Sequence, residues 1–306
     1  MASITPIELS DAERDALYDA LAEVKTEHGS LIPDQDAMSH AAAEAIKTHC
    51  PSLYDAVAKV ASEQSTPALH LRNIPMADKE LSSHRRQLRP NAVTNLPSQL
   101  RHILAMGLRG IVDEHAVDYE VKPVVVQEIR SDKPHGGRDM HVDHHEASAR
   151  RDGGRQRFIT VACKEGSDER TLVADLEGAL AQLDDDQIAQ LQGPNFRLIN
   201  RPFALIQQRD DGQYRLNLDE INMEAIRNLR GVDDAASQTL ADFISALERV
   251  AKQPENGVQL QAGEMLLLDQ SRALHATTGH TLENVRGITH VAFKAGDERN
   301  PGAMIG

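Results

Sequence analysis

The sequence contains no tryptophan, and aromatic residues make up only 3% of it. Aromatic side chains supply the surfaces on which proteins stack bases and sugars, so no such platform is expected. Cysteine is almost as scarce. Cys50 and Cys163 are far apart and form no C-x-x-C pair, which supports neither a disulfide scaffold nor a cysteine zinc site. Any metal ion would need histidine and carboxylate ligands.

Basic residues are also in short supply, with 33 Lys and Arg against 47 Asp and Glu, for a net charge of −14. This surface would repel nucleic acid and anionic membranes, so neither is an expected partner. No apolar run approaches the roughly 18 residues of a membrane helix, and acidic residues stand where a signal peptide would be basic. We expect a cytoplasmic protein that acts on a small molecule. The composition predicts nothing about its oligomeric state.

The first part of the chain, about residues 1–115, is predicted to be a helical layer. Ser10 can cap a helix, and Glu13, three residues later, can complete a capping box. Apolar residues then recur at helical spacing, which predicts one buried face: Leu17, Leu21 and Val24. Further helices are predicted over residues 36–50, where a proline follows, and 96–115.

The remainder, about residues 116–306, is rich in β-branched residues punctuated by Gly, Pro, Asn and Asp. Strands are predicted over residues 119–129, 157–164, 195–208, 257–270 and 287–296, with helical inserts over 175–192 and 233–253. No repeat or low-complexity linker divides the chain, and 40% hydrophobic residues suffice for a core. We therefore expect one domain, residues 1–306, of the β-rich α+β class.

The densest cluster of chemically active side chains is "MHVDHHE", residues 140–146. His141 and Asp143 are separated by one residue, which places both on one face at a strand end. The best candidate for a third ligand is His275, which follows an apolar strand. Two imidazoles and one carboxylate on one face of an octahedral ion leave three positions open. This arrangement suits non-haem Fe(II) binding a bidentate keto acid and then O2.

A keto-acid co-substrate with a second carboxylate also needs a cationic partner. Arg286 lies eleven residues after His275, at the start of the next predicted strand, and its planar guanidinium matches a carboxylate. Thr171, in "DERTLVADLEGAL", offers a hydroxyl for the same carboxylate. Thr171 could equally be the N-cap of a helix that begins there.

The order of these residues resembles that of a known family. His-x-Asp is followed by "TLVADLEGALAQL", then by the glycine-turn strand "VQLQAGEMLLLDQSRALHA", then by arginine. This order is similar to the clavaminate synthase and taurine dioxygenase superfamily of Fe(II)/2-oxoglutarate-dependent oxygenases. A family-typical stretch, x-L-x-x-G-D-x-x-x-x-D-N-R-x-x-L-H-G-R, lines up with Gly263, Asp269, Leu274 and His275, and Arg272 lies one residue after the position of the family's arginine. The resemblance covers roughly residues 69–294, because "LHLRNIP" is also similar to an early family strand.

The resemblance implies a double-stranded β-helix (jelly roll) core and a dioxygenase that uses Fe(II), 2-oxoglutarate and O2. It implies that His141, Asp143 and His275 hold the iron. Arg286 would then grip the distal carboxylate of 2-oxoglutarate, assisted by Thr171. The reaction would release CO2 and succinate while a C–H bond is oxidised. Because Asp143 fills the position that halogenating relatives leave empty, hydroxylation is the expected outcome, although desaturation uses the same ligands.

The identity of the substrate is less constrained. Where many relatives have a second arginine this chain has His290, which weighs against a sulfonate or carboxylate held at that point. Gln127 and Glu128, on the strand before the motif, could bind an amino or amide group, and His144 could line the entrance. We expect a small polar substrate, a free amino acid or a derivative. A sulfonate and a natural-product intermediate are the alternatives within this class.

Other interpretations of the same residues remain open. "DHH" at 143–145 is a hallmark of manganese-dependent DHH phosphoesterases, but these need an upstream Asp-x-Asp pair that follows an early strand of a parallel sheet, whereas Asp34 and Asp36 lie in the helical first part of the chain. A hydrolytic zinc site could use the same three ligands and a water, although it gives Arg286 no role. A non-catalytic binding module, or a set of merely structural polar residues, is a third possibility. Cys163 and Arg272 are interpreted as structural.

Overall fold

The protein is described from a computed structural model. The structure describes residues 2–28, 35–75, 100–116, 119–131, 138–141, 155–163, 169–197, 202–217, 229–278 and 286–298. The α-helices in these ranges are α1 (Asp11–His28), α2 (Gln35–His49), α3 (Pro51–Ala61), α5 (Leu100–His115), α7 (Leu176–Leu180), α8 (Asp185–Gln192) and α10 (Asp234–Ala251).

The longer strands are β1 (Ile4–Glu8), β2 (Ala68–Arg72), β3 (Tyr119–Ser131), β4 (Arg138–His141), β5 (Arg155–Cys163), β6 (Thr171–Asp175), β13 (Glu264–Asp269), β14 (Ala273–Thr277) and β15 (Arg286–Glu298). The shorter ones are β7 (Phe196–Arg197), β8 (Pro202–Phe203), β9 (Ile206–Gln208), β10 (Tyr214–Leu216), β11 (Arg230–Gly231) and β12 (Gly257–Val258). The fold is thus of the mixed α+β class.

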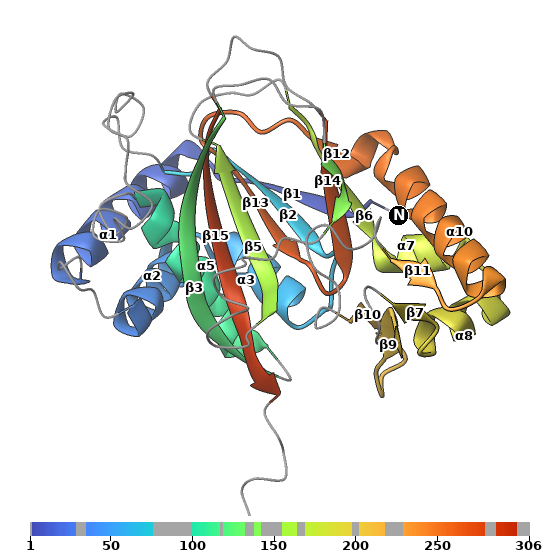
Figure 1. The fold of residues 1–306 in the computed structure, drawn as a ribbon. Coiled ribbons are helices and arrows are strands. Elements are labelled where there is room, and N and C mark those ends of the chain that lie inside the picture. Colours follow the sequence, from blue (N-terminus) through green and yellow to red (C-terminus); the bar gives the residue numbers. More distant parts are fainter. Residues whose placement is uncertain are drawn as a thin grey trace, which may run out of the picture.

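Two sheets form the centre of the molecule (Figure 1). One has six strands in the order β1-β2-β13-β5-β15-β3, and the other has four in the order β12-β6-β14-β4. A buried apolar cluster contains Val161 and Leu266 from the six-stranded sheet together with Val173 and Ala273 from the four-stranded sheet. Because both sheets contribute to this cluster, they face each other across it.

Helices cover the outer faces of both sheets (Figure 1). On the six-stranded sheet, Phe158, Ala162 and Leu267 belong to a cluster with the apolar residues of α1, α2, α3 and α5. On the four-stranded sheet, Ala174 and Leu274 pack with α7, α8 and α10. Alternate residues of each strand point to opposite faces, so these strands are buried on both sides. A strand position can therefore be assigned to the interior between the sheets or to a helical layer by its parity.

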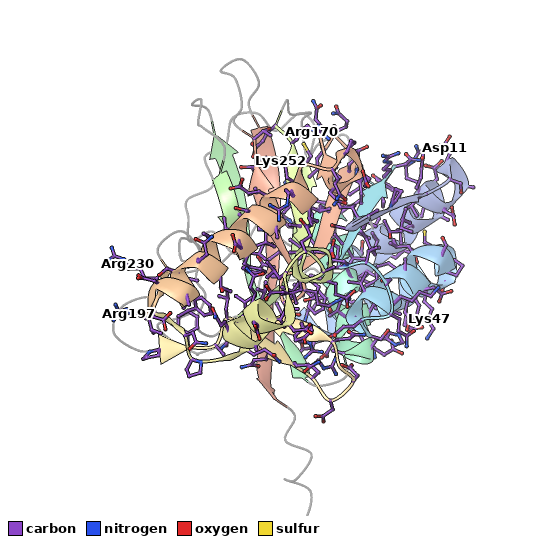
Figure 2. The ribbon with its side chains drawn as sticks, turned by 90° about the vertical axis from the view of Figure 1, so that its right-hand side faces the viewer. Asp11, Lys47, Arg170, Arg197, Arg230 and Lys252 are labelled. Atoms are coloured by element: carbon purple, nitrogen blue, oxygen red, sulfur yellow. The ribbon has the colours of Figure 1, made fainter. Side chains whose placement is uncertain are left out.

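Several charged side chains mark the periphery. Asp11 and Lys47 lie at one side of the molecule, and Arg197 and Arg230 lie at the opposite side (Figure 2). None of the helices in the described ranges is long and apolar enough to cross a membrane.

The predicted start of the first helix is confirmed. The Ser10 amide donates to the carboxylate of Glu13 at 2.9 Å, and the Glu13 amide donates to the Ser10 hydroxyl at 3.3 Å, which completes the capping box. The predicted apolar face of α1 is buried. The helices predicted over 36–50 and 96–115 correspond to α2 and α5. Residues 96–99 of the second prediction lie outside the described part.

Several features differ from the prediction. The strand predicted over 195–208 contains the short strands β7, β8 and β9, and the 175–192 insert contains two helices, α7 and α8. The proline that was expected only to end α2 also begins α3, because its missing N–H and fixed φ suit the first helical turn. β1 was not predicted, since its stability depends on the parallel pairing with β2 far along the chain. Thr171 is not a helix N-cap. It begins strand β6, and the side chain of Asp175 caps α7 instead by accepting from the Gly178 amide.

Candidate functional site

His275 lies in the middle of β14, on the face of the four-stranded sheet that looks toward the six-stranded sheet. Its neighbours along the strand, Leu274 and Ala276, pack against the helices, whereas Ala273 belongs to the core between the sheets. Alternation therefore places His275 on the interior face, where its side chain is buried with 5% of its surface exposed. Burial of a polar ring in this core is costly unless it is bonded, which makes His275 a strong candidate for a functional residue.

The second candidate ligand, His141, is the last residue of β4 and the Cα partner of His275 in the antiparallel β14–β4 pair. Directly opposed residues share one face of a sheet, with Cβ atoms about 4.5–5.5 Å apart. Two histidines more than a hundred residues apart are thus neighbours across two strands. The side chain of His141 lies outside the described part, as do Asp143 and His144.

Thr171 is close to this pair. It is the Cα partner of Thr277 in the β6–β14 pair, two positions from the pairing of His275 with Val173. Residues two apart on a strand share a face, so Thr171 lies on the same interior face as His275. Its side chain is buried, with 4% exposed. Thr171 can therefore present its hydroxyl to a ligand bound beside the histidine pair.

Arg286 begins β15 at the same end of the molecule. β5 ends at Cys163, whose Cα partner on β15 is Ile288, and the chain then passes to Thr171 at the start of β6. β14 likewise ends at Thr277 before the chain passes to Arg286. Glu264, at the start of β13, is the Cα partner of Cys163, and only residues 270–272 separate the end of β13 at Asp269 from the start of β14 at Ala273. β14 therefore begins at the end of the sheets away from Cys163 and runs back toward it. Its last residue Thr277, with Thr171 beside it, thus lies at the end where Arg286 begins β15 (Figure 1). The side chain of Arg286 lies outside the described part.

Strand register assigns the candidate substrate-binding positions on β3 and β15 to two different faces of the six-stranded sheet. His290 is opposite Gln127 on one side and Val161 on the other, and Val161 belongs to the core between the sheets. Thr289 is opposite Glu128 and Ala162, and Ala162 belongs to the helical side. The register favours positions 127 and 290, on the interior face, over position 128.

A buried pair that the sequence did not reveal lies on the same face of the six-stranded sheet. His70 Nε2 is 3.0 Å from the carboxylate of Glu264, and the two side chains are 6% and 16% exposed. Burial lowers the pKa of His70, and the hydrogen bond to Glu264 offsets only part of this effect. The sequence predicts only a strand around His70, because its partner Glu264 lies far along the chain. The pair is a buried polar contact at the edge of the interior.

The donor set suits an octahedral metal ion such as Fe(II). Opposed imidazoles on one sheet face can bind an ion between their strands, and a carboxylate two residues after the first histidine can complete a facial triad. Within the described ranges no three His, Cys, Asp or Glu side chains form a metal-binding group, since two of the predicted ligands have side chains outside them. The structure thus shows the backbone positions of His141 and His275, and the assignment of these two residues and Asp143 as iron ligands stays a prediction.

Several structural interpretations are confirmed. Cys50 and Cys163 are free thiols and both are buried. Burial, with a smaller effect of Glu13, raises the pKa of Cys50 to about 11. Arg272 donates to the carbonyl oxygen of Ser65 at 2.5 Å, which is a structural contact.

No protein-family model matches the sequence, and no curated protein matches it. The fold does match solved structures. An asparagine oxygenase in complex with Fe(II), 2S,3S-3-hydroxyasparagine and succinate aligns with a TM-score of 0.68 and 15% identity, over 94% of this chain and 92% of that one. The non-haem iron oxygenase OrfP in complex with Fe and alpha-ketoglutaric acid aligns with a TM-score of 0.66 and 16% identity, over 94% and 93%.

A third structure, OrfP in complex with Fe and L-Arg, aligns with a TM-score of 0.63 and 15% identity, over 94% of this chain and 93% of that one. Likeness at this level of identity is likeness of fold. The chain therefore has the fold of these oxygenases over nearly its whole length.

Proposed function

We propose that this protein is an Fe(II)- and 2-oxoglutarate-dependent dioxygenase that hydroxylates an unactivated C–H bond of a small polar molecule. The observation that carries the proposal is the pairing of His275 with His141 on the interior face of the four-stranded sheet. The solved oxygenases that share the fold were obtained with Fe(II) or Fe, and one of them with alpha-ketoglutaric acid. We further propose a double-stranded β-helix core and a single domain spanning residues 1–306.

The site residues divide into two groups. His141, Asp143 and His275 would hold the iron, each from a backbone fixed by strand pairing or directly after it. Arg286 and Thr171 would bind the distal carboxylate of 2-oxoglutarate, because both lie at the same end of the sheets. Iron loaded with 2-oxoglutarate supplies oxidation by O2, with release of CO2 and succinate. The protein places the reactants, neutralises the carboxylate and excludes water with the apolar core between the sheets.

The substrate is proposed to be a free amino acid or a derivative. Two of the solved structures contain an amino acid, hydroxyasparagine in one and L-Arg in the other. Positions 127 and 290 lie opposite one another on the interior face, and either can supply a polar group. A sulfonate or a natural-product intermediate is the alternative. The proposed partner is thus a small molecule, and the net charge of −14 disfavours nucleic acid.

Two rival functions are weaker. A DHH phosphoesterase would require a parallel sheet, whereas the described pairings of both central sheets are antiparallel except for β1 with β2. A zinc hydrolase would use the same ligands but would have no use for a guanidinium at position 286.

The test is anaerobic addition of Fe(II) and 2-oxoglutarate, followed by absorption spectroscopy. We expect the weak visible charge-transfer band of a bidentate keto acid on iron. Folded, iron-loaded protein without that band would refute the proposal. His141→Ala should abolish the band, whereas His144→Ala should leave it in place, since crowding of His144 onto the same ion would block its open positions. Succinate release can then be screened against the common L-amino acids to identify the substrate.

A further inference from the structure

A buried ionic cluster lies outside the residues assigned above. We call it the Glu63 cluster; its members are Glu63, Arg157, Arg209, Arg215 and Asp269. Glu63 follows α3 with φ +62°, a left-handed conformation that costs free energy in any residue except glycine. Its side chain is only 3% exposed and receives hydrogen bonds from three guanidiniums, that of Arg209 at 2.8 Å. A strained, buried carboxylate with three cationic partners requires a reason.

Arg157 links Glu63 to a second buried carboxylate. Its guanidinium binds both carboxylate oxygens of Asp269 at 3.1 Å, and Asp269 is completely buried. Burial by itself raises the pKa of Asp269, but Arg157, Arg272 and the Ser271 hydroxyl outweigh it, so that the pKa lies below its ordinary value. Asp269 is therefore an ionised partner of Arg157 at neutral pH.

A circuit of hydrogen bonds connects the cluster to the turn before β14, the strand that contains His275. Arg209 and Arg215 belong to the hairpin of β9 and β10. The amide of Leu216, at the end of that hairpin, donates to the Ser271 carbonyl at 2.8 Å. The Ser271 amide in turn donates to Asp269 at 3.0 Å. Glu63 thus fixes the hairpin against the turn that leads into β14.

This circuit lies at the end of β14 opposite to the proposed co-substrate end. β14 runs from Ala273, next to the circuit, through His275 to Thr277, next to Thr171. If 2-oxoglutarate occupies the Thr171 and Arg286 end, a second substrate must approach the iron from another direction. The Ala273 end, with the hairpin beside it, is the end opposite to Thr171.

We propose that Glu63 is a positioning residue for the substrate side of the iron site, which rests on the proposed function. Its carboxylate holds Arg209 and Arg215, and through them the hairpin, at a set distance from the root of β14. Without the negative charge, Arg157 keeps Asp269 and Arg209 keeps Asp211, but the acceptor that joins the three guanidiniums is lost. The most exposed element is then the one that moves. That element is the hairpin, whose Arg209 and Arg215 side chains are 21% and 17% exposed.

The experiment compares Glu63→Gln and Arg209→Gln with the wild type. Arg209→Gln removes the partly exposed contact with Glu63 and the ion pair with Asp211 but leaves the buried Glu63, Arg157 and Asp269 in place, so it is the variant more certain to fold. Arg249→Gln is the matched control, because Arg249 is an exposed arginine that donates to Gln182 far from the cluster. Two quantities are measured: hydrogen exchange of residues 205–217, and succinate formed per amino acid hydroxylated, with the amino acid that the wild type oxidises.

We expect both cluster variants to exchange the 205–217 amides roughly tenfold faster or more, since local opening becomes cheaper. We also expect excess succinate over hydroxylated product, with the charge-transfer band unchanged. Arg249→Gln should match the wild type in all three. Unchanged exchange would overturn the proposal, because Glu63 would then not hold the hairpin. Faster exchange with no excess of succinate over hydroxylated amino acid would overturn it too, since Glu63 would then hold the hairpin without placing the substrate. A missing band in the wild type would instead refute the proposed function, and the exchange data would still decide whether Glu63 holds the hairpin.

Discussion

Replacement of Thr171 by valine should weaken the binding of 2-oxoglutarate without disturbing the fold. Valine has nearly the shape of threonine and suits a strand, and the Thr171 side chain is buried against the interior with 4% exposed. The substitution therefore removes one hydroxyl from a water-poor site. A hydrogen bond to a charged group is worth about 1.5–3 kcal/mol. At about 1.4 kcal/mol per factor of ten, the dissociation constant should rise roughly 10- to 150-fold.

The assay is anaerobic titration of the Fe(II)-loaded protein with 2-oxoglutarate, monitored by the charge-transfer band. Pyruvate provides an internal comparison, because it is a keto acid without the distal carboxylate. Thr171→Val should leave pyruvate binding unchanged. The matched control is Thr239→Val, since Thr239 is also buried and its hydroxyl donates to Gln190 at 2.6 Å in the helical layer. This control should cost stability and leave the titration unchanged. A dissociation constant for 2-oxoglutarate within about twofold of wild type in Thr171→Val would refute the assignment.

Two further predictions concern the body of the protein. Gly110→Ala on α5 should lower the free energy of unfolding, measured in urea, by about 1–2 kcal/mol. The added Cβ would lie 2.7 Å from the Ser39 carbonyl oxygen of α2, and this overpacking costs more than the gain in helix propensity. A stabilised variant would show that α2 and α5 are less closely packed. The free energy of unfolding should fall as the pH drops from 7 to 5.5, and it should fall less steeply in His70→Gln. Because the pKa of His70 is lowered in the folded protein, the unfolded chain takes up this proton first, from about pH 6.5 downward. Identical slopes in the two proteins would show that His70 does not contribute to this pH dependence.

Local sequence signals were reliable where one element contained all of the information. The capping box of Ser10 and Glu13 and the apolar face of α1 need only neighbouring residues, and both are present. Errors arose where the outcome depended on distant partners. β1 is a strand because β2 pairs with it, and Thr171 begins a strand because β14 and β12 lie on either side of β6. The 175–192 insert divides into α7 and α8 because Asp184 caps a second helix.

The residue chemistry of the sequence predicts the kind of site. Scarce cysteine left histidine and carboxylate as ligands, and the spacing of His141, Asp143, His275 and Arg286 predicted an iron and keto-acid site. Only the tertiary structure made His141 and His275 opposite residues of two strands, and only strand register separated position 127 from position 128. The Glu63 cluster was invisible in the sequence, because it joins residues from the turn after α3, from β5 and β13, and from the β9–β10 hairpin. Donor type is a property of single residues, whereas pairing and charge neutralisation are properties of the packed chain.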